Sequence, residues 1–240
     1  MRTTAVILSG GKGKRMGTAL SKQYLELEGH PVLYYALKTF EKSSVDNIVI
    51  VCGEGDEAYI RENITDKYNI KKISAIVTGG KERYNSVYNG LKAIEEKNIP
   101  ADIVLIHDGA RAFITVETIE QLIKCCETEK ACVAAVKVKD TIKISDEEGY
   151  IKETMPRENL WQIQTPQTFE YSLIKKAYDY VLSGDTSGIT DDAMVLEKYC
   201  DRKIKLVEAS YNNIKITTPE DMLFGKAIID SYILQQTDED

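Results

Sequence analysis

Short apolar runs alternate along most of the chain with longer segments whose apolar residues recur every three or four positions. The apolar runs predict buried strands at Thr4–Leu8, Asn47–Val51, Ile73–Thr78, Ile103–His107 and Cys132–Val138. The longer segments predict amphipathic helices at Val32–Phe40, Asp56–Asn63, Ser86–Glu96 and Val116–Glu129. Strands that alternate with helices are typical of a mostly parallel sheet covered on both faces. We therefore predict an α/β, Rossmann-like fold.

The pattern changes after Val138. Polar and apolar residues alternate through Asp140–Glu153 around a Glu148-Gly149 turn, which predicts a hairpin, a protruding β-arm at about residues 139–155. Further helices are predicted at Tyr171–Leu182, Asp191–Tyr199 and Pro219–Leu234, the last with Thr218 as its N-cap. No repeat or linker divides the chain, so we expect a single domain over residues 1–240.

Composition narrows the function classes. The net charge of −7 argues against a general nucleic-acid binder, although it allows a local basic pocket. The five cysteines are scattered, no CxxC spacing occurs and only two histidines are present, so neither a disulfide framework nor a zinc site is expected. No apolar run is long enough to span a membrane. We expect a soluble, cytoplasmic protein.

A glycine-rich loop with several cations follows the first predicted strand of this acidic chain, "LSGGKGKRMG" at residues 8–17. Glycines allow backbone N–H groups to converge on an anion, and nearby cations add charge-assisted hydrogen bonds, so the loop predicts a di- or triphosphate cradle. A solvated glycine turn is the plainer alternative. The P-loop pattern is absent, and Met16 stands where a dinucleotide fingerprint needs its last glycine.

Three other polar segments are predicted at the same edge of the sheet as this loop. Lys22 follows it in "SKQYLEL", "GGKERYNS" (79–86) comes after the third strand, and "HDGAR" (107–111) ends the fourth. Parallel sheets bind ligands at the carboxyl ends of their strands. The sequence therefore predicts one site that all four segments share.

Eight motifs together resemble the 2-C-methyl-D-erythritol 4-phosphate cytidylyltransferases, which are nucleotidyltransferases of the sugar-phosphate type. They are "GGKGKRMG", "SKQY", "GGKERYNSVYNGL", "HDGAR", "KDTIK", "PRENLWQIQTPQTF", "TDDA" and "NIKITTPEDM", in family order and spacing almost from end to end. The departures are mild: Ser9-Gly10 replaces two alanines, Ala112 a common proline and Asp192 a frequent glutamate.

The resemblance implies that a phosphate oxygen of the acceptor attacks the α-phosphorus of CTP, expels pyrophosphate and uses Mg²⁺. It implies catalytic roles for Arg15, Lys22, Arg157 and Lys215. It implies nucleotide contacts from Ser9, Gly10, Gly11, Gly13, Lys14, Gly80, Arg83 and Ser86. It implies acceptor contacts from Asp108, Arg111, Thr141, Thr165 and Thr190, with Asp108 also near the metal. Four of these residues have plain structural alternatives: Arg15 could be a surface arginine, Lys22 could be a solvated lysine at a helix start, Ser86 could cap a helix and Asp108 could pair with Arg111.

The family also implies a homodimer formed through the β-arm, with Thr141 and Arg157 reaching the partner's site. Three alternatives remain open from the sequence. A ribitol 5-phosphate cytidylyltransferase would share the CTP site and differ in its acceptor. A nicotinamide-dependent oxidoreductase is disfavoured by the broken fingerprint, and a non-catalytic nucleotide-binding module is disfavoured by the many cations.

Overall fold

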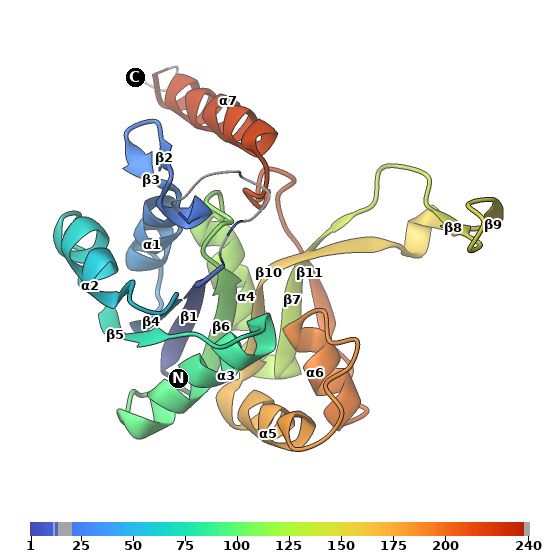
Figure 1. Ribbon diagram of the computed structural model, residues 1–240, viewed down its shortest axis with the longest axis horizontal. Coiled ribbons are helices and arrows are strands. Elements are labelled where there is room, and N and C mark those ends of the chain that lie inside the picture. The colour runs from blue at the N-terminus through green and yellow to red at the C-terminus, as the bar shows by residue number, and fades with distance from the viewer. Residues whose placement is uncertain (12, 14–20, 238–240) are drawn as a thin grey trace.

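A seven-stranded sheet forms the centre of the computed structural model, which describes residues 1–11, 13 and 21–237, with side chains up to residue 231. In spatial order its strands are β11 (Lys205–Glu208), β7 (Ala131–Lys137), β10 (Trp161–Glu170), β6 (Ile103–Asp108), β1 (Thr3–Ser9), β4 (Asn47–Cys52) and β5 (Ile73–Thr78). Strand β10 is antiparallel to both of its neighbours, and the other pairings are parallel. The mostly parallel α/β fold is therefore confirmed (Figure 1).

Helices cover both faces of this sheet. One face carries α1 (Val32–Lys42), α2 (Glu57–Ile60) with its continuation η3 (Arg61–Asp66), and α4 (Val116–Glu129). The other face carries α3 (Arg83–Glu96), α5 (Tyr171–Leu182) and α6 (Asp192–Tyr199). Successive residues of β1 point to opposite faces, so Ala5 and Ile7 pack in the first core and Val6 packs in the second. Such two-sided burial explains why the strands are continuous apolar runs.

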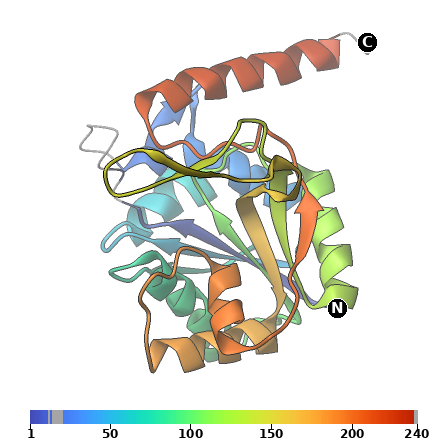
Figure 2. The same ribbon diagram turned by 90° about the vertical axis from the view of Figure 1, so that its right-hand side faces the viewer.

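The last helix, α7 (Pro219–Thr237), lies across the carboxyl edge of the sheet, as Figures 1 and 2 show. A small apolar cluster joins it to the body through Leu27, Val32, Phe113 and Ile216. Leu27 belongs to a short hairpin of β2 (Glu26–Leu27) and β3 (His30–Pro31), which the sequence pattern did not indicate. Within the described helices, none is both long and apolar enough to cross a bilayer.

The helix predicted at Ser86–Glu96 begins three residues earlier, at Arg83. The side chain of Asn85 accepts a hydrogen bond from the backbone N–H of Glu82, which closes the first turn. Ser86 therefore lies inside the helix, and its interpretation as the N-cap is wrong. Pro219 begins α7 as predicted, and the carboxylate of Asp221 accepts from the N–H groups of Thr217 and Thr218.

Two strands of the main sheet, β10 and β11, were not predicted. Strand β10 contains Pro166 and five polar residues between its ends, so it has no apolar run. Its register shifts between Ile163 and Gln167, which accommodates a proline that has no N–H for the sheet. This irregularity lies at the carboxyl edge of β6, beside the predicted site.

The predicted arm is present as a hairpin of β8 (Lys143–Ser145) and β9 (Ile151–Thr154), with Gly149 in its turn at a φ of +90°. It projects away from the body (Figure 1), and residues 139–154 are exposed throughout. Its apolar side chains include Ile144, Tyr150 and Ile151, which have exposed fractions of 41%, 69% and 69%. The arm therefore has no apolar core of its own within one chain.

Candidate active site

The first strand and the segment after the glycine-rich loop meet at the carboxyl edge of the sheet. The buried Ser9 donates its hydroxyl hydrogen bond to the Val51 carbonyl, and its own carbonyl accepts from the Gln23 side chain. A Cβ on Gly10 would lie 3.1 Å from the Cys52 carbonyl oxygen, so the turn is closely packed there. Gly11 faces open space, and Gly13 has a φ of +56°. The predicted cradle residues Lys14 and Arg15 lie outside the described residues.

Lys22 is buried beside the segment that carries Lys215, so its interpretation as a solvated lysine is wrong. Its Nζ donates to the Ile216 carbonyl over 2.7 Å. Two residues further on, the Tyr24 hydroxyl donates to Asp56 over 2.9 Å, which fixes the short η2 turn (Lys22–Tyr24) against the loop after β4. Two of the cations predicted to be catalytic are thus brought to the same place from positions far apart in the chain.

Asp108, the last residue of β6, is paired with two cations. Its Oδ2 accepts from Lys215 Nζ at 2.6 Å, and its Oδ1 accepts from Arg83 Nε at 3.3 Å. Burial alone would raise the pKa of this carboxyl, but the charges of Arg83 and Lys215 outweigh burial and hold the pKa well below its usual range. Asp108 is therefore an anion surrounded by positive charge.

Arg83 also forms a two-pronged pair with a second carboxylate, Asp192, whose oxygens accept from Nη1 and Nη2 at 2.8 Å each. Burial disfavours the charged guanidinium, yet Asp192 and Asp108 raise the pKa of Arg83 well above its usual value. Sequence reasoning did not place Asp192 in the site. Its motif "TDDA" was noted, but the residue that it contacts is 109 positions away.

Thr165 and His107 form a buried hydrogen-bonded pair behind Asp108. The Thr165 hydroxyl oxygen accepts from the Asp108 backbone N–H at 3.0 Å and lies 3.1 Å from His107 Nδ1. His107 Nε2 lies 3.1 Å from the carbonyl oxygen of Arg111. Burial lowers the pKa of His107 to about 4, so this imidazole is neutral near neutral pH. The pair holds the strand end in place.

Arg111 donates from Nη1 to the Asn213 carbonyl over 2.8 Å rather than to Asp108. The alternative of an Asp108–Arg111 ion pair is therefore wrong, because Asp108 pairs with Arg83 and Lys215 instead. In the described part of the chain, the buried Nε of Arg111 has no hydrogen-bond partner. An unpaired buried donor is costly, so this nitrogen is a polar group whose partner the described chain does not supply.

The second glycine turn is closed by Ser86, whose hydroxyl accepts from the Gly80 N–H at 3.0 Å and donates to the Glu82 carbonyl at 3.2 Å. A Cβ on Gly79 would lie 2.7 Å from that hydroxyl oxygen, so only glycine fits there without a shift. Gly80, Ser86 and Arg83 are thus neighbours at the start of α3, as the motif predicted.

Three predicted acceptor-side residues are exposed. Thr141 and Arg157 belong to the projecting arm and its root, where Arg157 Nη1 donates to the Lys139 carbonyl at 2.8 Å. Thr190 is exposed just before α6. One chain therefore brings Lys22, Arg83, Asp108, Arg111, Thr165 and Lys215 together, and it leaves Thr141 and Arg157 on the arm.

The donor set at this edge suits a metal held mainly by phosphates. Among the residues that the structure describes, no group of three or more His, Cys, Asp or Glu side chains is arranged to hold a metal ion by itself. Magnesium ions in nucleotide sites usually bind one or two carboxylates together with substrate phosphates and waters. Asp108 is a carboxylate at the appropriate strand end, so the residues fit that arrangement.

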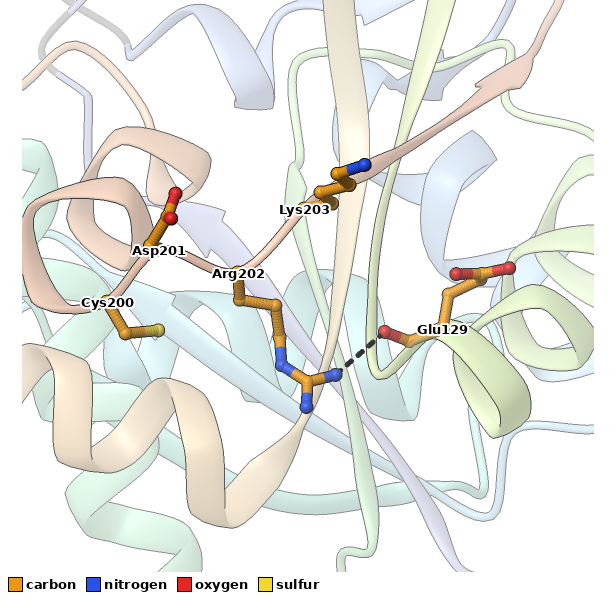
Figure 3. Close-up of a pocket in the computed structure, with 5 residues that line it drawn as sticks. All are labelled: Glu129, Cys200, Asp201, Arg202 and Lys203. Atoms are coloured by element: carbon orange, nitrogen blue, oxygen red, sulfur yellow. Dashed lines mark hydrogen bonds between the residues drawn. The ribbon is translucent and has the colours of Figure 1, made fainter.

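Two surface hollows lie away from these residues. A hollow of about 470 Å³ is lined by Glu129, Cys200, Asp201, Arg202 and Lys203, and Arg202 donates to the Glu129 carbonyl at 3.2 Å (Figure 3). Its residues precede β7 and β11, at the opposite edge of the sheet from Asp108. A hollow of about 370 Å³ lies between α7 and the loop that carries Tyr211. Neither is lined by a predicted site residue.

Comparisons with known proteins agree with this geometry. The family model of 2-C-methyl-D-erythritol 4-phosphate cytidylyltransferase matches residues 3–231. The cytidylyltransferase of that name from Lachnoclostridium phytofermentans is 47% identical over 228 residues, which are 95% of this chain and 96% of the relative. The one from Alkaliphilus oremlandii is 46% identical over 229 residues, 95% of each chain. The crystal structure of 4-diphosphocytidyl-2C-methyl-D-erythritol synthase from Anaerococcus prevotii has a TM-score of 0.84 at 35% identity and covers 95% of this chain and 96% of its own.

A mostly parallel sheet covered by helices, a glycine-rich loop after its first strand and cations around one aspartate at its carboxyl edge agree with the matched relatives, and together they identify a nucleotidyltransferase. The matches extend over nearly the whole length of both this chain and its relatives. The chain belongs to the 2-C-methyl-D-erythritol 4-phosphate cytidylyltransferase family.

Proposed function

We propose that this chain transfers the cytidylyl group of CTP to 2-C-methyl-D-erythritol 4-phosphate, giving 4-diphosphocytidyl-2-C-methyl-D-erythritol and pyrophosphate in non-mevalonate isoprenoid biosynthesis. The observation that carries this proposal is the convergence of Lys22, Arg111 and Lys215 beside Asp108, in a chain of this family. Such a cluster suits a reaction between a triphosphate and a phosphomonoester, both of which are highly charged anions.

In this reaction an oxygen of the acceptor phosphate attacks the α-phosphorus of CTP. The new P–O bond forms as the bond between the α-phosphorus and the bridging oxygen breaks, and pyrophosphate leaves with that electron pair. No covalent enzyme intermediate is needed, so catalysis consists of positioning and charge stabilisation. Lys22 is assigned to the α-phosphate, where negative charge increases in the transition state. Arg15 is assigned the same role from the sequence.

The acceptor phosphate is assigned to Lys215 and Arg111. Lys215 is 40% exposed at its side chain and so can turn from Asp108 toward a ligand, and Arg111 has an unused Nε donor. Cations bind a phosphomonoester dianion without protonating the oxygen that attacks. Thr165 and Thr190 are assigned as hydroxyl contacts on the same side.

Magnesium is proposed as the cofactor, with Asp108 as its protein contact directly or through water. When bound, the ion supplies positive charge to the triphosphate oxygens. Lys215 and Arg83 already neutralise Asp108, so phosphate oxygens would provide most of the ligands. The nucleotide base and ribose are assigned to Gly80, Ser86 and Arg83.

A homodimer formed through the arm completes the proposed site. Thr141 and Arg157 lie on an arm that projects from its own body, and the exposed apolar residues of the hairpin need a covering surface. A partner subunit would provide that surface and receive the two residues. We also propose that the reaction takes place in the cytoplasm, where cysteines stay reduced, and this is supported by five cysteines that form no disulfide.

Pyrophosphate release from CTP and Mg²⁺ tests the function, with 2-C-methyl-D-erythritol 4-phosphate and ribitol 5-phosphate as parallel acceptors. We expect kcat/KM for the methylerythritol acceptor to be higher by about tenfold or more, because a site built to bind specific hydroxyls rejects a mismatched polyol. Preference for ribitol 5-phosphate would move the protein to the alternative function. Release with neither acceptor would overturn the acceptor assignment.

A further inference from the structure

Asp192, a side chain with no role in the mechanism above, is held as a charged group in the interior. Its side chain is 0% exposed at the first turn of α6. Besides the two Arg83 nitrogens, its Oδ1 accepts from the Tyr178 hydroxyl at 2.6 Å. A buried carboxylate is costly unless it is paired and hydrogen-bonded, and here both conditions are met.

The backbone of Asp192 is fixed as firmly as its side chain. The Gln167 side-chain oxygen accepts from the N–H groups of Asp192 and Ala193 at 2.9 Å each. The Gln167 amide group donates to Asp191, whose other oxygen caps α6 by accepting from the Met194 N–H. The start of α6 is thereby attached to β10, next to the strand irregularity that carries Thr165.

A row of alternating charges leads from Asp192 to the proposed acceptor site. Asp192 binds the two terminal nitrogens of Arg83, Arg83 Nε reaches Asp108 Oδ1 at 3.3 Å, and Asp108 Oδ2 binds Lys215 Nζ at 2.6 Å. The contact between Arg83 and Asp108 is the longest of these, because the guanidinium fork is directed at Asp192. Of the two cations that contact Asp108, the half-exposed Lys215 is therefore the closer one.

We propose that Asp192 is a positioning residue for the reaction: by holding the fork of Arg83, it keeps Asp108 and Lys215 available to the acceptor and its phosphate. This inference rests on the proposed function. Without the Asp192 charge, the two freed N–H donors of Arg83 would find their nearest carboxylate in Asp108. A guanidinium fork matches a carboxylate with two parallel hydrogen bonds, so Arg83 would compete with Lys215 for Asp108.

The test compares Asp192→Asn with Asp191→Asn in steady-state pyrophosphate release at saturating CTP, because Arg83 is also assigned to the nucleotide. Both changes remove a carboxylate from the start of α6, but only Asp192 contacts Arg83. We expect Asp192→Asn to lower kcat/KM for the acceptor by about 10- to 100-fold, chiefly through the acceptor KM, because small misplacements of positioning groups have effects of this size. Asp191→Asn should stay within about threefold of wild type. Equal effects of the two variants would overturn the proposal.

A double variant separates positioning from a general loss of structure. If Asp192 acts through Arg83, the combination Arg83→Lys with Asp192→Asn should be no worse than the more damaging single change, because both interrupt the same contact. Effects that multiply would overturn the proposal. Wild-type turnover is measured first. If the wild-type protein shows no turnover, the proposed function itself is wrong. If it turns over normally and the effects of the two substitutions multiply, only the role of Asp192 is wrong.

If Asp192→Asn does not fold, Tyr178→Phe tests the positioning role of Asp192 instead. It removes one hydrogen bond to Asp192 and keeps every charge of the row. Its matched control is Tyr88→Phe, because the Tyr88 hydroxyl donates to Asp179 and the two rings lie near each other at 6.4 Å. We expect a rise of about two- to fivefold in the acceptor KM for Tyr178→Phe alone. Equal KM values in the two tyrosine variants would contradict the proposal.

Discussion

At the scale of single residues, His107 links three parts of the candidate site without facing a ligand itself. The Arg111 carbonyl can only accept a hydrogen bond, so His107 Nε2 carries the proton and Nδ1 accepts from the Thr165 hydroxyl. Thr165 in turn has a fixed hydroxyl direction, with one acceptor position already used by the Asp108 N–H. A neutral imidazole is thus required for this arrangement.

The buried neutral state of His107 predicts a loss of stability in acid. Its pKa is about 4 in the folded protein against 6.5 for an ordinary histidine, so the unfolded chain binds the extra proton between these two values. Stability should fall by about 3 kcal/mol as the pH drops from 6.5 to 4. Asp108, whose pKa is lowered instead, contributes stability that is lost only below about pH 3.8.

Urea unfolding of three proteins at pH 7 and pH 4.5 checks this prediction. The chain has only two histidines, so His30→Gln provides the matched control. Wild type and His30→Gln should lose stability between the two pH values, and His107→Gln should lose much less of it. If only the His30→Gln variant kept its stability between pH 7 and pH 4.5, the loss of stability in acid could not be assigned to His107.

Some site residues were predictable singly, whereas their partners were not. Asp108 ends a predicted strand and Ser86 follows a predicted glycine turn, so local sequence is enough to place both at the carboxyl edge, whereas Lys215 was assigned to the site only through the family resemblance. The pairing of Lys215 with Asp108 joins residues 107 positions apart, and no local pattern specifies it. Arg83 and Asp192 are 109 positions apart in the sequence, so only the fold shows that Asp192 is the main partner of Arg83.

At the scale of elements, the packing of α3 on the sheet depends on the absence of one side chain. A Cβ on Gly90 would lie 2.6 Å from a methyl group of Val6 and 2.9 Å from one of Val51, both in the central strands. Alanine favours a helix by about 1 kcal/mol over glycine, but overpacking of a core costs about 1–3 kcal/mol. The close approach of helix and sheet therefore requires glycine here.

Gly90→Ala should lower the free energy of unfolding by about 1–2 kcal/mol, measured by denaturant unfolding. Gly225→Ala in α7 is the comparison, because its Cβ would meet only side-chain ends, those of Leu27 at 3.1 Å, Phe113 at 3.2 Å and Ile216 at 3.5 Å. That variant should stay close to wild type. Equal stability of the Gly90 variant and wild type would show that α3 can move without cost.

Elements with a regular apolar pattern were correctly predicted, and the two missed strands of the main sheet, β10 and β11, lack such a pattern. Strand β10 is a polar antiparallel strand with an internal proline, and it is buried because β6 and β7 enclose it. Strand β11 is a short edge strand of four residues, Lys205–Glu208, most of them exposed. In both cases neighbouring strands rather than local preference determine the structure.

At the scale of the whole molecule, the arm is a part of the described chain whose apolar side chains a single copy leaves exposed. If a second copy covers it, replacing Tyr150 and Ile151 by serine should weaken the dimer by about 100-fold or more, since each buried apolar side chain contributes about 1.5–3 kcal/mol. Light scattering over a dilution series measures this change. Lys152→Ser, an exposed polar position of the same strand, should leave the dimer intact.

Unchanged association of the serine variant would place the interface elsewhere, and the exposed side chains of Leu223 and Phe224 on α7 are then the next surface to alter. A monomeric variant that kept full turnover would show that Thr141 and Arg157 are not needed from a partner.

The bond from Lys22 to the Ile216 carbonyl has a consequence for the order in which the protein is built on the ribosome. A chain that has emerged as far as β11 holds all seven strands of the main sheet, yet it lacks both Lys215 and the carbonyl that anchors Lys22. The sheet is thus complete before the last anchors of the charged site have been synthesised. A chain of that length therefore has every strand of the main sheet but lacks the two contacts that residues 215 and 216 make with Asp108 and Lys22.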